Sequence, residues 1–381
     1  MRFLLILMSL FLVSCTTTDK QRIFDIATSE QPDKAIKAIV KDKQVRYQQN
    51  PEQIVKDVQA IGDLFTQLKK GIRVVWGEKQ IQLPTNKRYV KYTNDYKARA
   101  IVDFEKGWVR VETIDTKSPT QMLQKAIVTT LLATSDPDKT DIFSSETPKA
   151  SGKPFLYQQV LDQDKQAIAY PWRANRFADY LITHHIKKRA IDYRFAHYVD
   201  ISLVEQHQHL RQEKFSEFVL SSAKRYQIAP ALIYGVIETE SSFNPFAVSH
   251  ANAYGLMQVV SSTAGRDVYQ KVKNKAGQPS KQVLFDPKQN IDIGTAYLYI
   301  LKNQYLSKIS NLTSRHYAVI SAYNGGAGNV LKTFSNDRKV AIERINTLAA
   351  NEVYDKLTQQ HPRVESRRYL YKVRKAEKKY Q

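Results

Sequence analysis

Apolar residues in the carboxy-terminal half of the chain recur at helical spacing. Ile233, Val236 and Ile237 share one face of a segment that begins at Pro230, a residue suited to the first helical position, and ends before Pro245. The same spacing predicts further helices over about residues 212–226, 290–307 and 315–324. The last of these stops at a run of glycines. This half is therefore predicted to be mostly helical.

The preceding part of the chain combines one long helical pattern with short alternating segments. Positions that step by three and four predict an amphipathic helix whose inner face holds Ile54, Val58, Ile61, Phe65 and Leu68. Strands are predicted over residues 72–77, 81–84, 88–92, 98–104 and 108–114, and a second helix over about 119–134. These elements predict a small antiparallel sheet packed on two helices, so the fold class of the whole chain is expected to be α+β.

Changes in composition suggest where the domains end. Residues 135–154 are rich in Asp, Ser, Thr, Lys and Pro, which is typical of a linker or a long exposed loop. Residues 155–200 mix aromatic with basic residues and are interpreted as a connector. We therefore expect an amino-terminal α+β domain over residues 15–134, a linker with connecting helices over 135–204, and a helical domain over 205–381. His184 and His185 would lie on different helical faces without an acid or cysteine at ligand spacing, so no metal site is expected.

The first residues are expected to be a targeting signal. Arg2 precedes an apolar run over residues 3–13 that is too short to span a bilayer and is typical of a signal peptide. Its end, Leu-Val-Ser-Cys over residues 12–15, looks like a bacterial lipobox, which implies cleavage after residues 1–14 and lipid attachment at Cys15. Two or more acyl chains would anchor the mature chain stably. A plain secretory signal with an incidental cysteine is the alternative. Cys15 is the only cysteine, so no internal disulfide can form.

One acidic residue lies in an unusual position on the helix that begins at Pro230. Advancing about 100° per residue, Glu240 falls in the middle of the apolar stripe, whereas Glu238 points away from it. Desolvation and the negative end of the helix would both raise the pKa of a carboxyl group placed there. A carboxylic acid still protonated near neutral pH is what glycosidic bond cleavage requires of its general acid. On spacing alone, an ordinary surface glutamate near a helix end remains the alternative.

The blocks that follow this glutamate form a recognisable series. They read Glu-Ser-Ser-Phe-Asn-Pro over residues 240–245, Ala-Tyr-Gly-Leu-Met-Gln over 253–258, Ala-Tyr-Asn-Gly-Gly over 322–326 and Glu-Ser-Arg-Arg-Tyr over 365–369. In this order and spacing, residues 205–381 resemble the lysozyme-like lytic transglycosylases of bacterial cell walls. The amino-terminal part resembles, more loosely, the corresponding domain of one membrane-bound member of that family. The resemblance implies a lysozyme-like helical domain in which Glu240 is the sole catalytic acid/base.

The resemblance also implies which side chains bind the substrate: Ser249, Gln258, Tyr323, Asn324, Glu365 and Tyr369. Residues 246–262 are then expected to form a small hairpin or loop that makes one wall of the cleft, where Gly255 would let the backbone approach a sugar closely. Gln258 offers a donor and an acceptor to an acetamido group, although a loop amide bonded only to backbone is the alternative. Tyr323 would lie beside the catalytic acid, with a structural core tyrosine as the alternative. The family often has proline soon after this glutamine, where Val259 and Val260 stand here.

The mechanism implied by the resemblance needs only one acid. A hydrolase of either stereochemical course requires a second carboxylate, and none is convincing in the matched blocks, because Glu238 faces away and Asp267 and Asp286 lie outside them. Glu240 would protonate the bond between N-acetylmuramic acid and N-acetylglucosamine, and the muramyl acetamide would stabilise the anomeric carbon. The C6 hydroxyl would then close a 1,6-anhydro ring without water, metal or cofactor. A hydrolase on the same fold and a non-catalytic glycan-binding anchor are the competing hypotheses.

The charge and the export signal together define the expected partners. Lys plus Arg, 58, exceed Asp plus Glu, 37, which gives a net charge of +21. The export signal and the lack of a recognised binding motif argue against nucleic acid. A basic surface suits peptidoglycan strands, whose stem peptides and lactyl groups carry carboxylates, and anionic membrane surfaces. Thr16 follows Cys15 in place of the Asp that commonly retains lipoproteins in the inner membrane, so the outer membrane, facing the periplasm, is the expected location.

Overall fold

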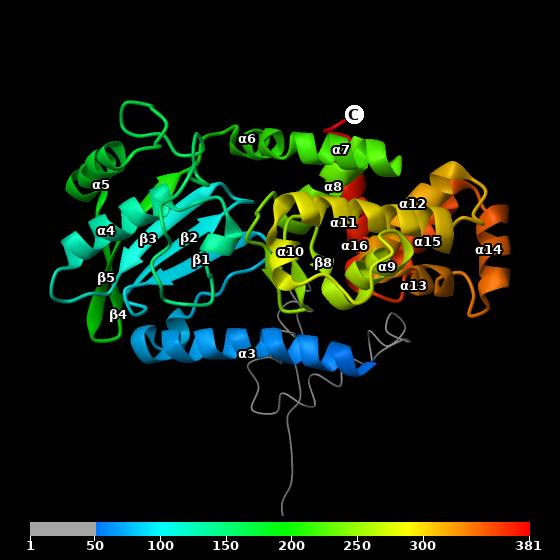
Figure 1. Cartoon of the computed structure of the whole chain (residues 1–381), viewed down its shortest axis with the longest axis horizontal. Coiled ribbons are helices and arrows are strands. Elements are labelled where there is room, and N and C mark those ends of the chain that lie inside the picture. Colours follow the sequence, from blue (N-terminus) through cyan, green and yellow to red (C-terminus); the bar gives the residue numbers. More distant parts are fainter. Residues whose placement is uncertain (1–50) are drawn as a thin grey trace, which may run out of the picture.

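A domain built on a β-sheet and a helical domain lie side by side in the computed structural model, which describes residues 51–381 (Figure 1). The expected signal peptide, the lipobox and Cys15 lie outside these residues. No helix in the described part of the chain is both long enough and apolar enough to cross a membrane.

Five antiparallel strands form the sheet, in the order β1-β2-β3-β5-β4. Three of them, β1 (Arg88–Thr93), β2 (Ala98–Asp103) and β3 (Trp108–Thr113), lie where strands are predicted. The other two, β4 (Lys187–Ile191) and β5 (Arg194–Ser202), belong to the segment expected to be a connector. That expectation is wrong for these residues, since β5 pairs with β3 along its length. Edge strand β4 is almost wholly exposed, so its sequence lacks the apolar alternation that marks a strand.

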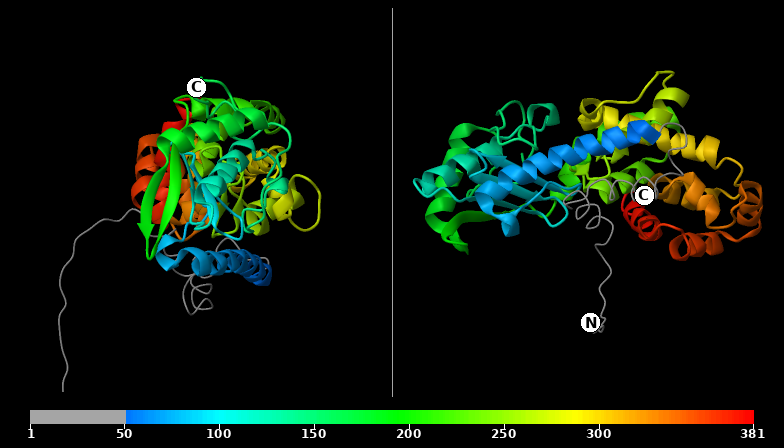
Figure 2. Two further views of the ribbon diagram at one scale, coloured as in Figure 1. Left: turned by 90° about the vertical axis from the view of Figure 1, so that its left-hand side faces the viewer. Right: turned by 90° about the horizontal axis from the view of Figure 1, so that it is seen from below.

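Helices cover the sheet on both faces. Helix α3 (Pro51–Trp76) begins close to the predicted amphipathic helix but continues through residues 72–76, where a strand is predicted. Ile72 and Trp76 are both fully buried at an i, i+4 spacing that suits a helix as well as a strand. Residues 81–84 form no strand either, because the Gln82 backbone N–H donates to the Tyr92 hydroxyl at 3.2 Å and not to a neighbouring strand. Helices α4 (Pro119–Leu132) and α5 (Pro171–His185) pack together on the sheet domain. Seen from below, α3 runs across both domains (Figure 2).

A buried ionic cluster joins α3 to the sheet. The Arg99 guanidinium bonds the Glu112 carboxylate at 2.7 Å and lies 3.9 Å from the centre of the Trp76 ring. Arg189, from edge strand β4, donates to the other oxygen of Glu112 at 2.8 Å. Arg99 and Glu112 are 2% and 1% exposed, so neither charge could be left alone without a large desolvation cost.

The helical domain begins with α6 (His207–Lys214) and α7 (Ser216–Tyr226) and is centred on α8 (Pro230–Ser241). A three-stranded hairpin sheet follows, made of β6 (Val248–Ser249), β7 (Ala253–Tyr254) and β8 (Val259–Val260), as expected for residues 246–262. The remaining helices are α9 (Arg266–Lys271), α10 (Lys281–Phe285), α11 (Pro287–Ile300), α12 (Leu312–Gly325), α13 (Ala327–Lys332), α14 (Arg338–Thr347), α15 (Ala350–Gln359) and α16 (Val364–Glu377). The predicted α+β class, with a small antiparallel-sheet domain before a mostly helical one, is confirmed.

Helix α8 is the core of the helical domain. Every residue from 231 to 237 is buried, and the helix packs along α16. Gly235 permits this close approach, because a Cβ atom there would lie 3.1 Å from both the Val373 carbonyl oxygen and the Glu377 backbone nitrogen. The position of α8, and of any side chain at its end, is therefore fixed by packing.

The two domains are joined by Arg211 of α6, which is 2% exposed. Its Nη2 donates to the Phe104 carbonyl at the end of β2 at 2.9 Å, and its Nε donates to the Ser242 carbonyl just after α8 at 3.2 Å. Its Nη1 donates to Gln159 Oε1 at 2.7 Å. Burial lowers the pKa of Arg211 to about 9. Since this side chain contacts both domains, it ties the end of α8 to the sheet.

Replacing Glu112 by Gln should destabilise the sheet domain strongly. The change leaves the buried Arg99 charge without its carboxylate, which is expected to lower the free energy of unfolding by about 3–5 kcal/mol. Denaturant unfolding followed by circular dichroism measures this loss. The matched control is Glu105→Gln, because Glu105 pairs with Lys87 on the surface, where the expected cost is about 0–1 kcal/mol. Equal effects of the two substitutions would contradict the assigned role of Glu112.

Candidate active site

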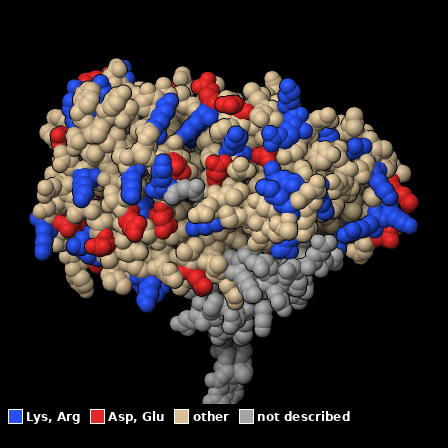
Figure 3. Space-filling model, in the orientation of Figure 1, with Lys and Arg blue, Asp and Glu red and all other residues tan. Residues whose placement is uncertain are grey.

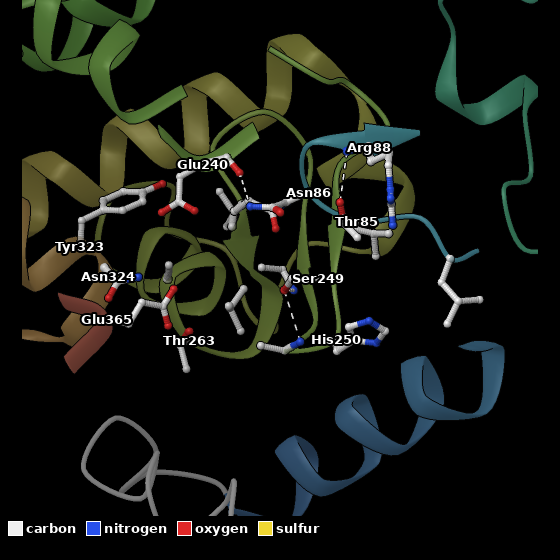
Figure 4. Close-up of a pocket in the computed structure, with 18 of the residues that line it drawn as sticks. Thr85, Asn86, Arg88, Glu240, Ser249, His250, Thr263, Tyr323, Asn324 and Glu365 are labelled. Carbon is white, nitrogen blue, oxygen red and sulfur yellow. Dashed lines mark hydrogen bonds between the residues drawn. The ribbon is translucent and has the colours of Figure 1, made fainter. Parts of the chain in front are cut away.

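A cavity of about 530 Å³ opens at the junction of the two domains (Figure 4). The helical domain supplies most of its wall, including five of the side chains singled out in the sequence: Glu240, Ser249, Gln258, Tyr323 and Asn324. Glu365 lines it as well. Side chains that lie far apart in the chain, from Glu240 to Glu365, therefore line the same cavity.

Glu240 stands in the last turn of α8, half-buried, with its carboxylate toward the cavity (Figure 4). The chain turns sharply after it, because Ser242 and Phe243 both have left-handed backbone conformations, with φ of 51° and 60°. The Ser241 hydroxyl holds this turn by donating to the Leu256 carbonyl at 2.8 Å. Glu238 is directed elsewhere: it accepts a hydrogen bond from the Tyr380 hydroxyl at 2.6 Å and pairs with Lys379. The helical spacing therefore separated the two glutamates correctly.

Gln258 and Ser249 lie on the hairpin wall, and both use part of their hydrogen-bonding capacity within the protein. Gln258 donates through Nε2 to the Gly255 carbonyl at 3.1 Å while it lines the cavity. The Ser249 hydroxyl oxygen accepts from the backbone N–H groups of Ala251 and Ala253 at 3.2 and 3.3 Å. The interpretation of Gln258 as a backbone-bonded loop amide is thus partly correct, and the side-chain carbonyl is the group left for a ligand.

Gly255 does not serve close approach of a sugar, contrary to expectation. With φ of +71°, a Cβ atom there would lie 2.4 Å from both Asn290 Nδ2 and the Leu284 carbonyl oxygen. Asn290 is fully buried and fixes the wall: its Oδ1 accepts from the Met257 N–H at 2.8 Å, and its Nδ2 donates to the Tyr254 carbonyl at 2.8 Å. The glycine is required because the protein itself fills the adjacent space.

Two tyrosines lie beside Glu240. The Tyr323 hydroxyl donates to the Met257 carbonyl at 2.9 Å, so it bonds the wall and not the carboxylate. Tyr369 of α16 is 5% exposed and is not among the residues that line the cavity. Burial, and after it the charge of Glu240, raises the pKa of both phenols well above the ordinary value. Both hydroxyls therefore stay protonated and can only act as neutral hydrogen-bonding groups near the carboxylate.

A second carboxylate faces the same cavity. Glu365 lies in the first turn of α16, across from α8. Its neighbour Ser366 donates to Asn324 Oδ1 at 2.7 Å, which joins the start of α16 to the end of α12. The sequence placed Glu365 in the cleft as a substrate-binding residue and gave no reason to consider it as a second acid. Other acids considered there lie elsewhere: Asp267 accepts from the Tyr305 hydroxyl, and Asp286 caps α11.

The sheet domain forms one side of the cavity, which the sequence did not indicate. The residues concerned lie before and at the start of β1: Ile81, Gln82, Leu83, Thr85, Asn86 and Arg88. Asn86 Nδ2 donates to the backbone carbonyl of Glu240 at 2.6 Å, and Asn244 Nδ2 donates to the Asn86 carbonyl at 3.1 Å. These residues form no motif in a single sequence, because their role arises only from contact with a segment more than 150 positions away.

No group of three or more His, Cys, Asp or Glu residues within residues 51–381 is arranged so that it could hold a metal ion.

Comparison with known proteins agrees with the division of the chain into two domains. Residues 54–214 match the family described as the N-terminal domain of membrane-bound lytic murein transglycosylase C, and residues 217–346 match the transglycosylase SLT domain. Membrane-bound lytic murein transglycosylase C of Photorhabdus laumondii is 48% identical over 330 residues, which cover 86% of this chain and 92% of that protein. The protein of the same name from Yersinia enterocolitica is 47% identical over 334 residues, or 87% and 93% of the two chains. The chain belongs to the membrane-bound lytic murein transglycosylase C family.

Proposed function

We propose that this lytic murein transglycosylase cleaves the β-1,4 bond between N-acetylmuramic acid and N-acetylglucosamine with Glu240 as its acid and base. The observation that carries the proposal is the position of Glu240. Its carboxylate ends a fully packed helix and faces a cavity long enough to involve both domains. Such a group is held in one geometry, as general acid catalysis requires.

The reaction can be written with one carboxyl group. Glu240 gives its proton to the glycosidic oxygen as the bond to the muramyl C1 breaks, and the muramyl acetamide oxygen stabilises C1. The carboxylate then takes the proton of the muramyl C6 hydroxyl while the C6 oxygen bonds to C1. The products are a 1,6-anhydromuramyl end and a free C4 hydroxyl on N-acetylglucosamine. The carboxyl group is restored to its starting form, and no water, metal or cofactor enters the balance.

The remaining cavity residues are proposed to hold the sugars. Gln258 would accept a hydrogen bond from an acetamido N–H through its side-chain oxygen, and Ser249 and Asn324 would contact hydroxyl groups. Tyr323 would keep the wall in place through its bond to Met257. Tyr369 would act on the carboxylate of Glu240 from behind, because it does not line the cavity.

Glu365 raises a second candidate function, hydrolysis. A hydrolase needs a second carboxylate as nucleophile or base, and Glu365 is the other carboxylate among the cavity's described lining residues. We favour a role in binding sugar hydroxyl groups. Its carboxylate lines the cavity from the first turn of α16, and its oxygens can accept hydrogen bonds from hydroxyl groups.

The chain is further proposed to work at the periplasmic side of the outer membrane. A lipid at Cys15 would hold it there, and the family name of its relatives says membrane-bound. Lys and Arg side chains are spread over both domains on the face shown in Figure 3, without a single stripe. A diffuse positive field of this kind suits the anionic peptidoglycan layer and anionic headgroups.

The sheet domain is proposed to position the catalytic residue. Asn86 supplies a donor to the Glu240 carbonyl, which lies in the last turn of α8, where helix carbonyls generally need donors from outside the helix. Arg211 does the same for the Ser242 carbonyl. Together these two hydrogen bonds hold the turn after Glu240, in which Ser242 and Phe243 have left-handed conformations.

Replacing Glu240 by Gln should abolish release of soluble muropeptides from purified sacculi, because a carboxamide is too weak an acid to protonate the glycosidic oxygen. We expect kcat to fall at least about a thousandfold, because the variant loses both the general acid and the general base. The matched control is Glu365→Gln, the same change in the same cavity, which should weaken substrate binding and raise KM while turnover persists. Normal turnover by Glu240→Gln, or equal abolition by both variants, would contradict the assignment of Glu240 as the single acid and base.

Replacing Asn86 by Ala should lower kcat by about tenfold or more while the chain remains folded, because the last turn of α8 loses its donor and Glu240 loses its fixed geometry. Thermal unfolding and kinetics on the same preparations separate the two effects. Asn175→Ala is the control, since Asn175 also donates to a backbone carbonyl, that of Pro171, but on the surface of α5. A decrease in kcat no larger than that of the control would show that Asn86 does not position Glu240.

A further inference from the structure

Arg88, the first residue of β1, lines the cavity from the sheet domain. In Figure 4 it lies on the opposite side of the pocket from Tyr323, with Glu240 between them. The side chain is half-buried, and burial lowers the pKa of its guanidinium. A charge that is partly removed from water inside a cleft normally has a partner.

Among the residues that the structure describes, Arg88 has no ion-paired partner. Within residues 51–381 no carboxylate oxygen lies within 4.0 Å of its guanidinium, and no hydrogen bond is formed by its side chain. Asp103 is its cross-strand neighbour, but the Asp103 carboxylate accepts from the Lys106 backbone N–H at 2.8 Å in the turn after β2. Other arginines of the same sheet are paired: Arg99 with Glu112 and Arg110 with Asp200.

The chemistry of an unpaired guanidinium specifies its ligand. Its planar fork of donors fits a carboxylate with two parallel hydrogen bonds. Glu240 and Glu365, which would repel a carboxylate, line the cavity together with Arg363, whose charge offsets part of that repulsion, whereas Arg88 is the charged residue that lines it from the sheet domain. We propose that Arg88 forms a subsite for a carboxylate of the glycan substrate, on the sheet-domain side of the cleft. This proposal rests on the proposed function, since it concerns the same cavity.

Two groups of the peptidoglycan strand carry a carboxylate. The lactyl group of N-acetylmuramic acid is a free carboxylate where the stem peptide is absent, and it becomes an amide where the peptide is attached. The stem peptide then provides carboxylates of its own. Arg88 would bind either carboxylate. The glycan strand whose affinity falls when Arg88 is replaced shows whether the lactyl group or the stem peptide supplies it.

Binding to catalytically inactive protein tests the subsite. Calorimetry on the full chain carrying Glu240→Gln would use three probes: the neutral tetramer of N-acetylglucosamine, a peptide-free glycan strand with lactyl carboxylates, and a peptide-bearing strand. Adding Arg88→Gln should weaken binding of at least one carboxylate-bearing strand about tenfold to a hundredfold and leave the neutral tetramer unchanged. Arg88→Lys should retain part of the affinity, because it keeps the charge and loses the fork.

Arg338→Gln, at the start of α14 and away from the cavity, is the control for the change in net charge. A loss confined to the peptide-free strand assigns the lactyl carboxylate, and a loss confined to the peptide-bearing strand assigns the stem peptide. Equal losses on all three probes, or no loss beyond that of Arg338→Gln, would overturn the subsite. If the protein with Arg88 intact bound none of the three, the proposed function would fall together with the subsite.

Discussion

The structure depends on how the last turn of α8 is held. A helix that ends beside an open cavity leaves carbonyl groups without partners, and here the chain then passes through two left-handed residues, Ser242 and Phe243. Donors from outside the helix satisfy these carbonyls: Asn86 bonds that of Glu240 and Arg211 bonds that of Ser242. Since Asn86 comes from the sheet domain and Arg211 contacts it, the geometry of the Glu240 carboxylate is a property of both domains.

This constraint gives the sheet domain a part in the geometry around Glu240. Its ionic cluster of Arg99, Glu112 and Arg189 is buried and paired, which gives the sheet one well-defined arrangement. The loop before β1 is therefore held in a fixed position against the helical domain. Next to it, the rings of Tyr89 and Phe246 pack together across the domain interface, with their centres 5.0 Å apart. The same loop supplies a wall of the cavity, so holding Glu240 and bordering the substrate are tasks of one short segment.

The sequence could predict those parts of the fold and of the site that depend on residues close together in the chain, and it missed those that depend on residues far apart. Helix α8, the inward direction of Glu240 and the outward direction of Glu238 follow from local spacing, and they were predicted. Strand β4 was missed because this edge strand has little buried surface and so carries no alternation of apolar residues, and β5, which lies between β3 and β4, was assigned with it to the connector. Asn86 and Arg88 were missed because nothing in their own neighbourhood reports a partner in the other domain. Gly255 was noticed, but the sequence could not tell that Asn290 fills the space beside it. The predicted rise in the pKa of the Glu240 carboxyl remains a prediction.

In the proposed reaction the C6 hydroxyl of the substrate, and not water, captures the anomeric carbon. Mass spectrometry of the muropeptides that the wild-type chain releases from purified sacculi distinguishes the two. We expect muramyl ends lighter than hydrolytic ends by one water molecule, which identifies the 1,6-anhydro ring. Reducing muramyl ends as the main product would contradict it and would make Glu365 a catalytic partner of Glu240.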